Sequence, residues 1–148
     1  MAFRRAASKD ALLLSNLALR SKAYWGYDDK FIEACKEGLT ITTEYIAKNP
    51  VYLLEQKNEI QGFYCFVVAA EKLDLLFVDS KHIGKGIGKK LWKHLILIAK
   101  QLGLSKFTID SDPNAEDFYK KMGAVRIGEI PSTVFSNRKL PLMQVMLD

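Results

Sequence analysis

The spacing of apolar residues divides the chain into a mainly helical first part, a strand-rich middle and a final part in which helices and strands alternate. Near the start, Leu13, Leu14 and Leu17 supply the apolar face of a helix that runs to about Lys22. Ser8 is suited to cap this helix, because a serine hydroxyl accepts a hydrogen bond from the free amides of a first turn. The aromatic stretch YWGYDD then interrupts the helical spacing.

Two shorter helices are predicted next. Asp28 and either Thr42 or Thr43 are cap residues, while Gly38 and the Asn-Pro pair after the third helix are typical of helix ends. Apolar, β-branched and aromatic runs bounded by turn residues predict strands at 2–7, 51–56, 60–70, 72–78, 105–111, 124–130 and 142–147. The three middle strands have short connections, which favours antiparallel pairing.

The most regular helical spacing follows these strands, at Ile87, Leu91, Leu95, Ile98 and Leu102. Gly103 is suited to end that helix, and the pair Asp112-Pro113 is suited to begin another that ends at Gly123. The whole pattern predicts one α/β (α+β) domain over residues 1–148. We expect a central mixed, mostly antiparallel twisted sheet of about seven strands with flanking helices.

Composition is that of an ordinary globular protein, with 49% hydrophobic and 26% charged residues among 148. No apolar run approaches the roughly 18–20 residues of a membrane helix. The arginine-bearing N-terminus has no small-residue cleavage site and contains Asp10, so we expect a cytoplasmic protein without a membrane partner. Cys35 and Cys65 are isolated in apolar surroundings, which predicts buried thiols and no metal site.

The stretch HIGKGIGKK, residues 82–90, joins a predicted strand to the long helix. Glycines in such a turn let a ligand approach the backbone, and the free amides of a helix start attract anions. Seven lysines and no acidic residue lie between Lys81 and Ile109. They form either a solvated helix face or an electropositive surface for a phosphate-bearing ligand. No recognised nucleic-acid motif accompanies them, so we expect no nucleic-acid partner.

The spacing of the glycines narrows the kind of phosphate site. The pattern is GxGxG, at Gly84, Gly86 and Gly88, and neither the dinucleotide pattern GxGxxG nor the P-loop pattern GxxxxGK[ST] is present. A turn of this kind is suited to a pyrophosphate, although many such turns are only tight strand-to-helix junctions.

The stretch LDLLFVDSKHIGKGIGKKLWKHL, followed after one more strand by SDPNAEDFYKKMGAVRIGE, resembles the GNAT superfamily of acyl-CoA-dependent N-acetyltransferases. The family motif [Gln/Arg]-x-x-Gly-x-[Gly/Ala] matches residues 83–88, with Ile83 in place of the usual Gln or Arg. Small bacterial members similarly carry His-Ile-Gly here, Trp-Gly-Tyr near the N-terminus and Asp-Pro-Asn-Ala-x-x-Phe-Tyr later. The order of the predicted elements agrees with the family over essentially the whole chain.

The resemblance implies a binding site for acetyl-CoA as acetyl donor. The backbone at the end of the strand, Phe77 and Val78, would pair with the pantetheine arm, and Asn114 would hydrogen-bond it. Tyr119 would stand near the thioester sulfur. The amides that would hold the pyrophosphate are those of Ile83, Gly84, Lys85, Gly86, Ile87, Gly88 and Lys89.

The implied reaction is direct attack of a substrate amine on the thioester. A backbone N–H near Val78 would stabilise the negative oxygen, and Tyr119 would protonate the leaving thiolate. Because Phe118 and Met122 are expected to face the core, Tyr119 should turn toward a cleft, the alternative being that it only packs there. Strand alternation puts Asp74 on one face with Val78, as a candidate base or simply a solvated carboxylate.

Tyr24, Trp25 and Tyr27 are candidates for the acceptor pocket, unless they only pack between helices. We therefore expect an N-acetyltransferase acting on a primary amine of a small molecule or peptide. The alternative is a non-catalytic acyl-CoA-binding or sensing domain on the same fold. Because GNAT proteins often dimerise, the resemblance also makes a homodimer a candidate assembly.

Overall fold

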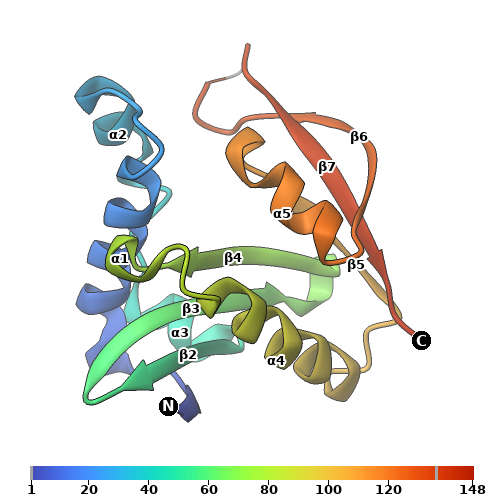
Figure 1. The fold of residues 1–148 in the computed structure, drawn as a ribbon, viewed down its shortest axis with the longest axis horizontal. Helices are drawn as coiled ribbons and strands as arrows, with labels where there is room; N and C mark the ends of the chain where they lie inside the picture. Colours follow the sequence, from blue (N-terminus) through green and yellow to red (C-terminus); the bar gives the residue numbers. More distant parts are fainter. Residues whose placement is uncertain (1, 136) are drawn as a thin grey trace.

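The computed structural model describes residues 2–135 and 137–148, which form one seven-stranded sheet in the order β1-β2-β3-β4-β5-β7-β6 (Figure 1). All neighbouring strands are antiparallel except β4 and β5, which are parallel. This confirms the predicted mixed, mostly antiparallel sheet. The strands are β1 (Ala2–Arg5), β2 (Val51–Gln56), β3 (Glu59–Val67), β4 (Lys72–Val78), β5 (Lys106–Asp110), β6 (Val125–Pro131) and β7 (Lys139–Met146).

Helices cover both faces of this sheet and enclose two apolar clusters. Leu14 of α1 and Ile46 of α3 pack with Phe63 on one face, whereas Leu91 of α4 and Tyr119 of α5 belong to the cluster on the other. Within the described residues, no helix is both long and apolar enough to cross a bilayer. The helices are α1 (Ala11–Ala23), α2 (Asp29–Cys35), α3 (Thr43–Lys48), α4 (Ile87–Gln101) and α5 (Glu116–Lys121).

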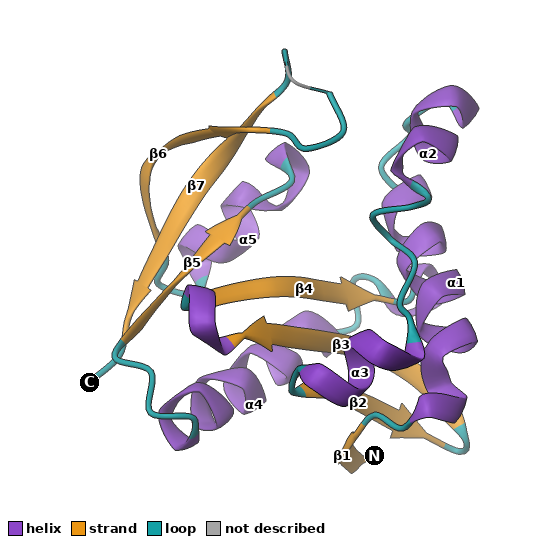
Figure 2. Ribbon diagram, turned by 180° about the vertical axis from the view of Figure 1, so that it is seen from behind, coloured by secondary structure: helices purple, strands orange, loops and turns teal. Residues whose placement is uncertain are grey.

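The sheet divides between its two parallel strands. Their register contains a single pair, Lys72 opposite Thr108, after which β4 and β5 diverge (Figure 2). On its other side β4 stays paired with β3 as far as Val78. The edge of β4 that faces β5 therefore has no strand partner over 73–78 in the described part of the chain.

The predicted side-chain caps are present at the starts of α2 and α3 and at the 3-10 turn before α5. The carboxylate of Asp28 accepts a hydrogen bond from the amide of Phe31 at 2.7 Å, and Thr42 accepts one from the amide of Tyr45 at 3.0 Å. Asp112 caps the turn before α5. Cys35 and Cys65 are both buried free thiols.

The prediction for the first helix is wrong in its cap and in part of its face. Residues 8–10 form a 3-10 turn, and Asp10 is buried because its carboxylate accepts two hydrogen bonds from Arg4 and one from the amide of Ala7. Leu13 is 58% exposed, whereas Ala18 is fully buried beside the sheet. Small side chains complete the buried face here, so counting only large apolar residues misplaces it.

Candidate active site

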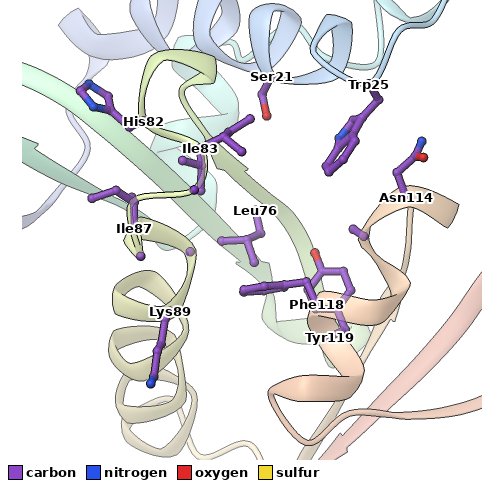
Figure 3. A pocket seen from close by; sticks show the side chains of 15 residues that line it. Ser21, Trp25, Leu76, His82, Ile83, Ile87, Lys89, Asn114, Phe118 and Tyr119 are labelled. Carbon is purple, nitrogen blue, oxygen red and sulfur yellow. The ribbon is translucent and has the colours of Figure 1, made fainter.

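A cavity of about 340 Å³ lies where β4 and β5 separate, on the face covered by α4 and α5 (Figure 3). We call it the loop cavity, because residues of the loop between β4 and α4 form one wall. Predicted site residues that line it are Trp25, Val78, Ile83, Gly84, Gly86, Ile87, Gly88, Lys89, Asn114 and Tyr119. Lining residues that sequence reasoning missed are Ser21, Leu76, His82, Ala115 and Phe118. His82, Ala115 and Phe118 lie within the motifs quoted above and could have been found from them, whereas Ser21 and Leu76 belong to no motif.

The three glycines of the loop serve two different purposes. Gly84 and Gly86 have φ values of 86° and 79°, in the left-handed region that disfavours any side chain, and a Cβ on either would project into open space. Gly88 lies inside α4, where a Cβ would come within 3.1 Å of the Phe118 ring. The first two glycines shape an open loop, and the third lets α4 pack closely against α5.

The loop and the start of α4 present unpaired backbone donors to this cavity. The helix begins at Ile87, and the amides of residues 86–89 donate to no acceptor within the described residues. The positive end of the helix dipole adds to their attraction for an anion. The amide of Lys85 differs from the prediction, because it already donates to the carbonyl of His82 at 3.3 Å.

A buried carboxylate fixes the loop against α1. Asp79, 2% exposed, accepts hydrogen bonds from Arg20 at 2.8 Å and from the amide of Lys81 at 3.2 Å. Burial by itself would raise the pKa of Asp79, but these hydrogen bonds outweigh it and the pKa lies below its ordinary value. Sequence reasoning missed this residue, although an acidic residue directly after a buried strand is a usable signal.

The backbone amide of Val78, at the end of β4, is a further hydrogen-bond donor that points into the gap between β4 and β5. Asp79 donates its amide to the carbonyl of Gln61 at 2.9 Å, so Asp79 and Gln61 form a hydrogen-bonded pair of the ladder. Such pairs alternate along an antiparallel ladder. The neighbouring pair, Val78 opposite Gly62, is therefore the non-bonded kind, and the amide of Val78 points away from β3, toward the gap.

Tyr119 lies deeper than the sequence predicts. It is 6% exposed and packs in the core, with its ring centroid 5.9 Å from that of Trp92, whereas Phe118 and Met122 are only partly buried. Trp92 of α4 contacts both Phe118 and Tyr119, so the side of α5 that faces the core includes Tyr119 as well. The Tyr119 hydroxyl nevertheless points into the loop cavity (Figure 3). Burial raises its pKa, and the charge of Asp112 adds to this, so the phenol stays protonated at neutral pH.

Asn114 and Tyr27 belong to one polar network. Asn114 donates from Nδ2 to the Tyr27 hydroxyl at 2.9 Å and to Asp112 at 3.0 Å. Tyr27 donates in turn to Asp112 and accepts from Arg138 at 2.7 Å. Of the three aromatic candidates only Trp25 lines the loop cavity; the exposed Tyr24 contacts the Trp25 ring edge-on.

A second cavity, of about 280 Å³, is formed by residues of α1, the end of α2, β4, β5 and the β6–β7 connection. We call it the charged cavity, because it contains three carboxylates and three cationic side chains. The charged residues are Lys22, Lys72, Asp74, Asp110, Asp112 and Arg138. Asp74, predicted as a candidate base, lies here beside the β6–β7 connection and not in the loop cavity.

The expected face of Asp74 is wrong because β4 contains a bulge. Cys65 pairs with Leu75 and Phe66 with Leu73, which leaves Asp74 without an opposite residue. The extra residue breaks the alternation, and Asp74 turns toward α3, where its carboxylate accepts a hydrogen bond from the Tyr45 hydroxyl at 2.5 Å. The Phe77 side chain packs on this same face, against Phe63.

Known proteins resemble the chain in both sequence and fold. Over 84 residues it is 31% identical to peptidyl-lysine N-acetyltransferase YjaB of Salmonella typhimurium, covering 56% of this chain and 55% of that protein. Over 86 residues it is 30% identical to 5-NmdU N-acetyltransferase of Pseudomonas phage PaMx11, covering 55% and 61%. The chain thus spans between half and two thirds of the length of these curated relatives.

Two solved structures share the fold at low sequence identity. A GCN5-related N-acetyltransferase from Rhodopseudomonas palustris superposes with a TM-score of 0.83 at 19% identity, covering 99% of this chain and 95% of the other. PaiA N-acetyltransferase from Thermoplasma acidophilum, solved in complex with coenzyme A, gives 0.79 at 18% identity, covering 98% of both chains. The family profile described as acetyltransferase (GNAT) domain matches residues 21–135. Because that match spans most of the chain, the protein belongs to the GNAT acetyltransferase family.

Proposed function

We propose that the protein is an N-acetyltransferase that moves the acetyl group of acetyl-CoA to a primary amine of a small molecule or peptide. The observation that carries this proposal is the row of unpaired amides at residues 86–89 beside the unpaired edge of β4. The curated relatives are both named as N-acetyltransferases, and one structural neighbour was solved with its cofactor acetyl-CoA. These facts support the same cosubstrate for this chain.

The residues of the loop cavity suit the parts of acetyl-CoA. The free amides of the loop and of the first turn of α4 would hold the pyrophosphate, with Lys89 adding positive charge. The open edge of β4 would accept the pantetheine arm as an added strand. Asn114 lines the same cavity and would donate to that arm, which requires it to leave Tyr27 or Asp112.

In the reaction that we propose, the amine nitrogen forms a bond to the acetyl carbon while the carbon–sulfur bond breaks. The amide of Val78 would stabilise the negative charge on the carbonyl oxygen. Tyr119 is protonated at neutral pH and would give its proton to the leaving thiolate. Asp74 would take the proton of the amine, directly or through water, from the opposite side of the gap between β4 and β5.

The experiment that tests the proposal has two parts. Acetyl-CoA should raise the melting temperature of the purified protein, because it binds the folded state. A library of primary amines should then be screened for release of CoA, detected with a thiol reagent. A protein that binds acetyl-CoA but releases no CoA with any amine is the non-catalytic sensor. A protein whose melting temperature does not respond to acetyl-CoA contradicts both functions.

A further inference from the structure

The charges in the charged cavity are paired unevenly. Lys72 pairs with Asp110 at 2.5 Å, and the carboxylate of Asp112 binds Lys22. Arg138 lies 3.7 Å from that same carboxylate, so two cations share one anion. Across β4, Asp74 receives the Tyr45 hydroxyl and, among the described residues, no cation within 4 Å.

One end of this cavity therefore has an excess negative charge, and the other an excess positive charge. The negative end is Asp74, at the bulge of β4 beside the gap. The positive end is the group of Lys22 and Arg138 around Asp112. A ligand that is neutral overall but carries a cation and an anion at its two ends matches this arrangement, because each end meets the charge that lacks a partner.

At the positive end, Arg138 is held in place by aromatic rings and has hydrogen-bond donors that are not used. The guanidinium of Arg138 lies over the rings of Tyr27 and Phe31, at 5.3 and 4.9 Å from their centroids. Its Nη2 donates to the Tyr27 hydroxyl, whereas Nε and Nη1 have no acceptor among the described residues. An arginine held by aromatic stacking with open donors is suited to a carboxylate, which it can bind through two parallel hydrogen bonds.

We propose that the acetyl acceptor is a small molecule with both a primary amine and a carboxylate, bound in the charged cavity. The ammonium group approaches Asp74 beside the gap, and the carboxylate binds Arg138. Leu39, Leu75 and Leu140 line the cavity and contact the carbon chain between the two groups. A volume of about 280 Å³ accommodates an acceptor of roughly the size of an amino acid. This inference rests on the proposed acetyltransferase function.

The test compares two acceptor series at saturating acetyl-CoA, with CoA release as the readout. One series contains linear ω-amino carboxylates of increasing length, and the other contains primary alkylamines of the same lengths. The best amino carboxylate should exceed its matched alkylamine in kcat/KM by roughly tenfold or more, since the alkylamine leaves the Arg138 donors unpaired.

Arg138→Gln should reduce this ratio to near one, mainly through a higher KM for the amino carboxylate. The matched control is Arg126→Gln, because Arg126 pairs with Glu116 and Glu129 on the surface and lines neither cavity. That control should keep the ratio of the unchanged protein. A melting-temperature increase with acetyl-CoA in Arg138→Gln shows that the variant is folded and that its loop cavity is intact.

Three results would overturn the inference. The alkylamines perform as well as the amino carboxylates, Arg138→Gln leaves the ratio unchanged, or a lysine side chain within a peptide is acetylated faster than any member of either series. The acceptor class is likewise wrong if other amines of the library are acetylated while neither series is. Failure of the acetyltransferase function itself is distinguishable, because the protein then releases no CoA with any amine of the library, whether or not it binds acetyl-CoA.

Discussion

The loop cavity and the charged cavity lie at the same split in the sheet, but they present different chemistry. The loop cavity offers mainly backbone amides and apolar side chains, whereas the charged cavity offers six charged side chains. A site built from backbone suits a ligand that a whole family shares. A site built from side chains can change by single substitutions, and so suits the ligand that differs between members.

The largest expected effect concerns Tyr119, the proposed proton donor in the loop cavity. Tyr119→Phe removes the proposed proton donor while keeping the ring in the core, so kcat should fall by about a hundredfold. The Kd for acetyl-CoA should stay within about twofold, since the ring packing is retained. Steady-state kinetics and calorimetric titration measure the two quantities. Unchanged kcat would assign Tyr119 to packing alone.

A substitution in the loop should affect only the loop cavity. Gly86→Val forces a β-branched residue into the left-handed region, at a cost of roughly 2 kcal/mol, which should weaken acetyl-CoA binding by about thirtyfold. The matched control is Gly128→Val on β6, where φ is not positive and a Cβ meets nothing within 4 Å. Equal losses of affinity in both variants would contradict the role assigned to the loop.

A substitution in the charged cavity should affect only the amine. Asp74→Asn removes the unpaired carboxylate, so kcat/KM for the acceptor at neutral pH should fall by about tenfold, with acetyl-CoA affinity unchanged. Raising the pH toward the pKa of the free amine should restore part of the rate, because the amine then loses its proton to water. A variant with full activity at neutral pH would remove Asp74 from the reaction.

The smallest expected effect is on stability at low pH. Hydrogen bonds from Arg20 lower the pKa of Asp79 despite its burial, and those from Lys22 do the same for Asp112. A carboxylate with a lowered pKa in the folded state stabilises above its ordinary pKa of about 3.9 and loses this contribution as the pH falls through its folded value. The free energy of unfolding should therefore decrease by on the order of 1 kcal/mol per carboxylate below about pH 4. Urea titrations of Asp79→Asn and Asp112→Asn should show a shallower pH dependence than the unchanged protein.

The same contrast explains which parts of the site could be predicted. The glycine loop and α4 lie in one contiguous stretch, so local spacing was enough to place them. The orientation of Asp74 depends on a bulge opposite Cys65 and Phe66, and that of Tyr119 on packing against Trp92. Neither partner is local in the sequence, so strand alternation predicts the wrong face for Asp74 and helix periodicity does not predict the burial of Tyr119.

The charged cavity could not be predicted from local sequence patterns, because its residues come from distant parts of the chain. Tyr27 and Arg138 are 111 residues apart and are joined by one hydrogen bond, at 2.7 Å. Asp112 was predicted only as a helix cap, and it does cap the turn before α5, but it also binds Lys22. When a residue has two roles, the sequence pattern around it indicates only the role that involves its sequence neighbours. Which distant elements lie side by side depends on the order of the strands in the sheet. The sequence pattern predicted the fold class but not that order.

The central claim is that the loop cavity binds the acetyl donor and the charged cavity binds the acceptor. Its most direct test is a ¹H–¹⁵N spectrum recorded during titration with CoA. We expect the largest changes at the amides of Gly84, Gly86 and Gly88, and changes near zero at Ser132 and Val134, which line the charged cavity. The opposite pattern, with the largest changes at Ser132 and Val134, would contradict the assignment of the loop cavity to the acetyl donor.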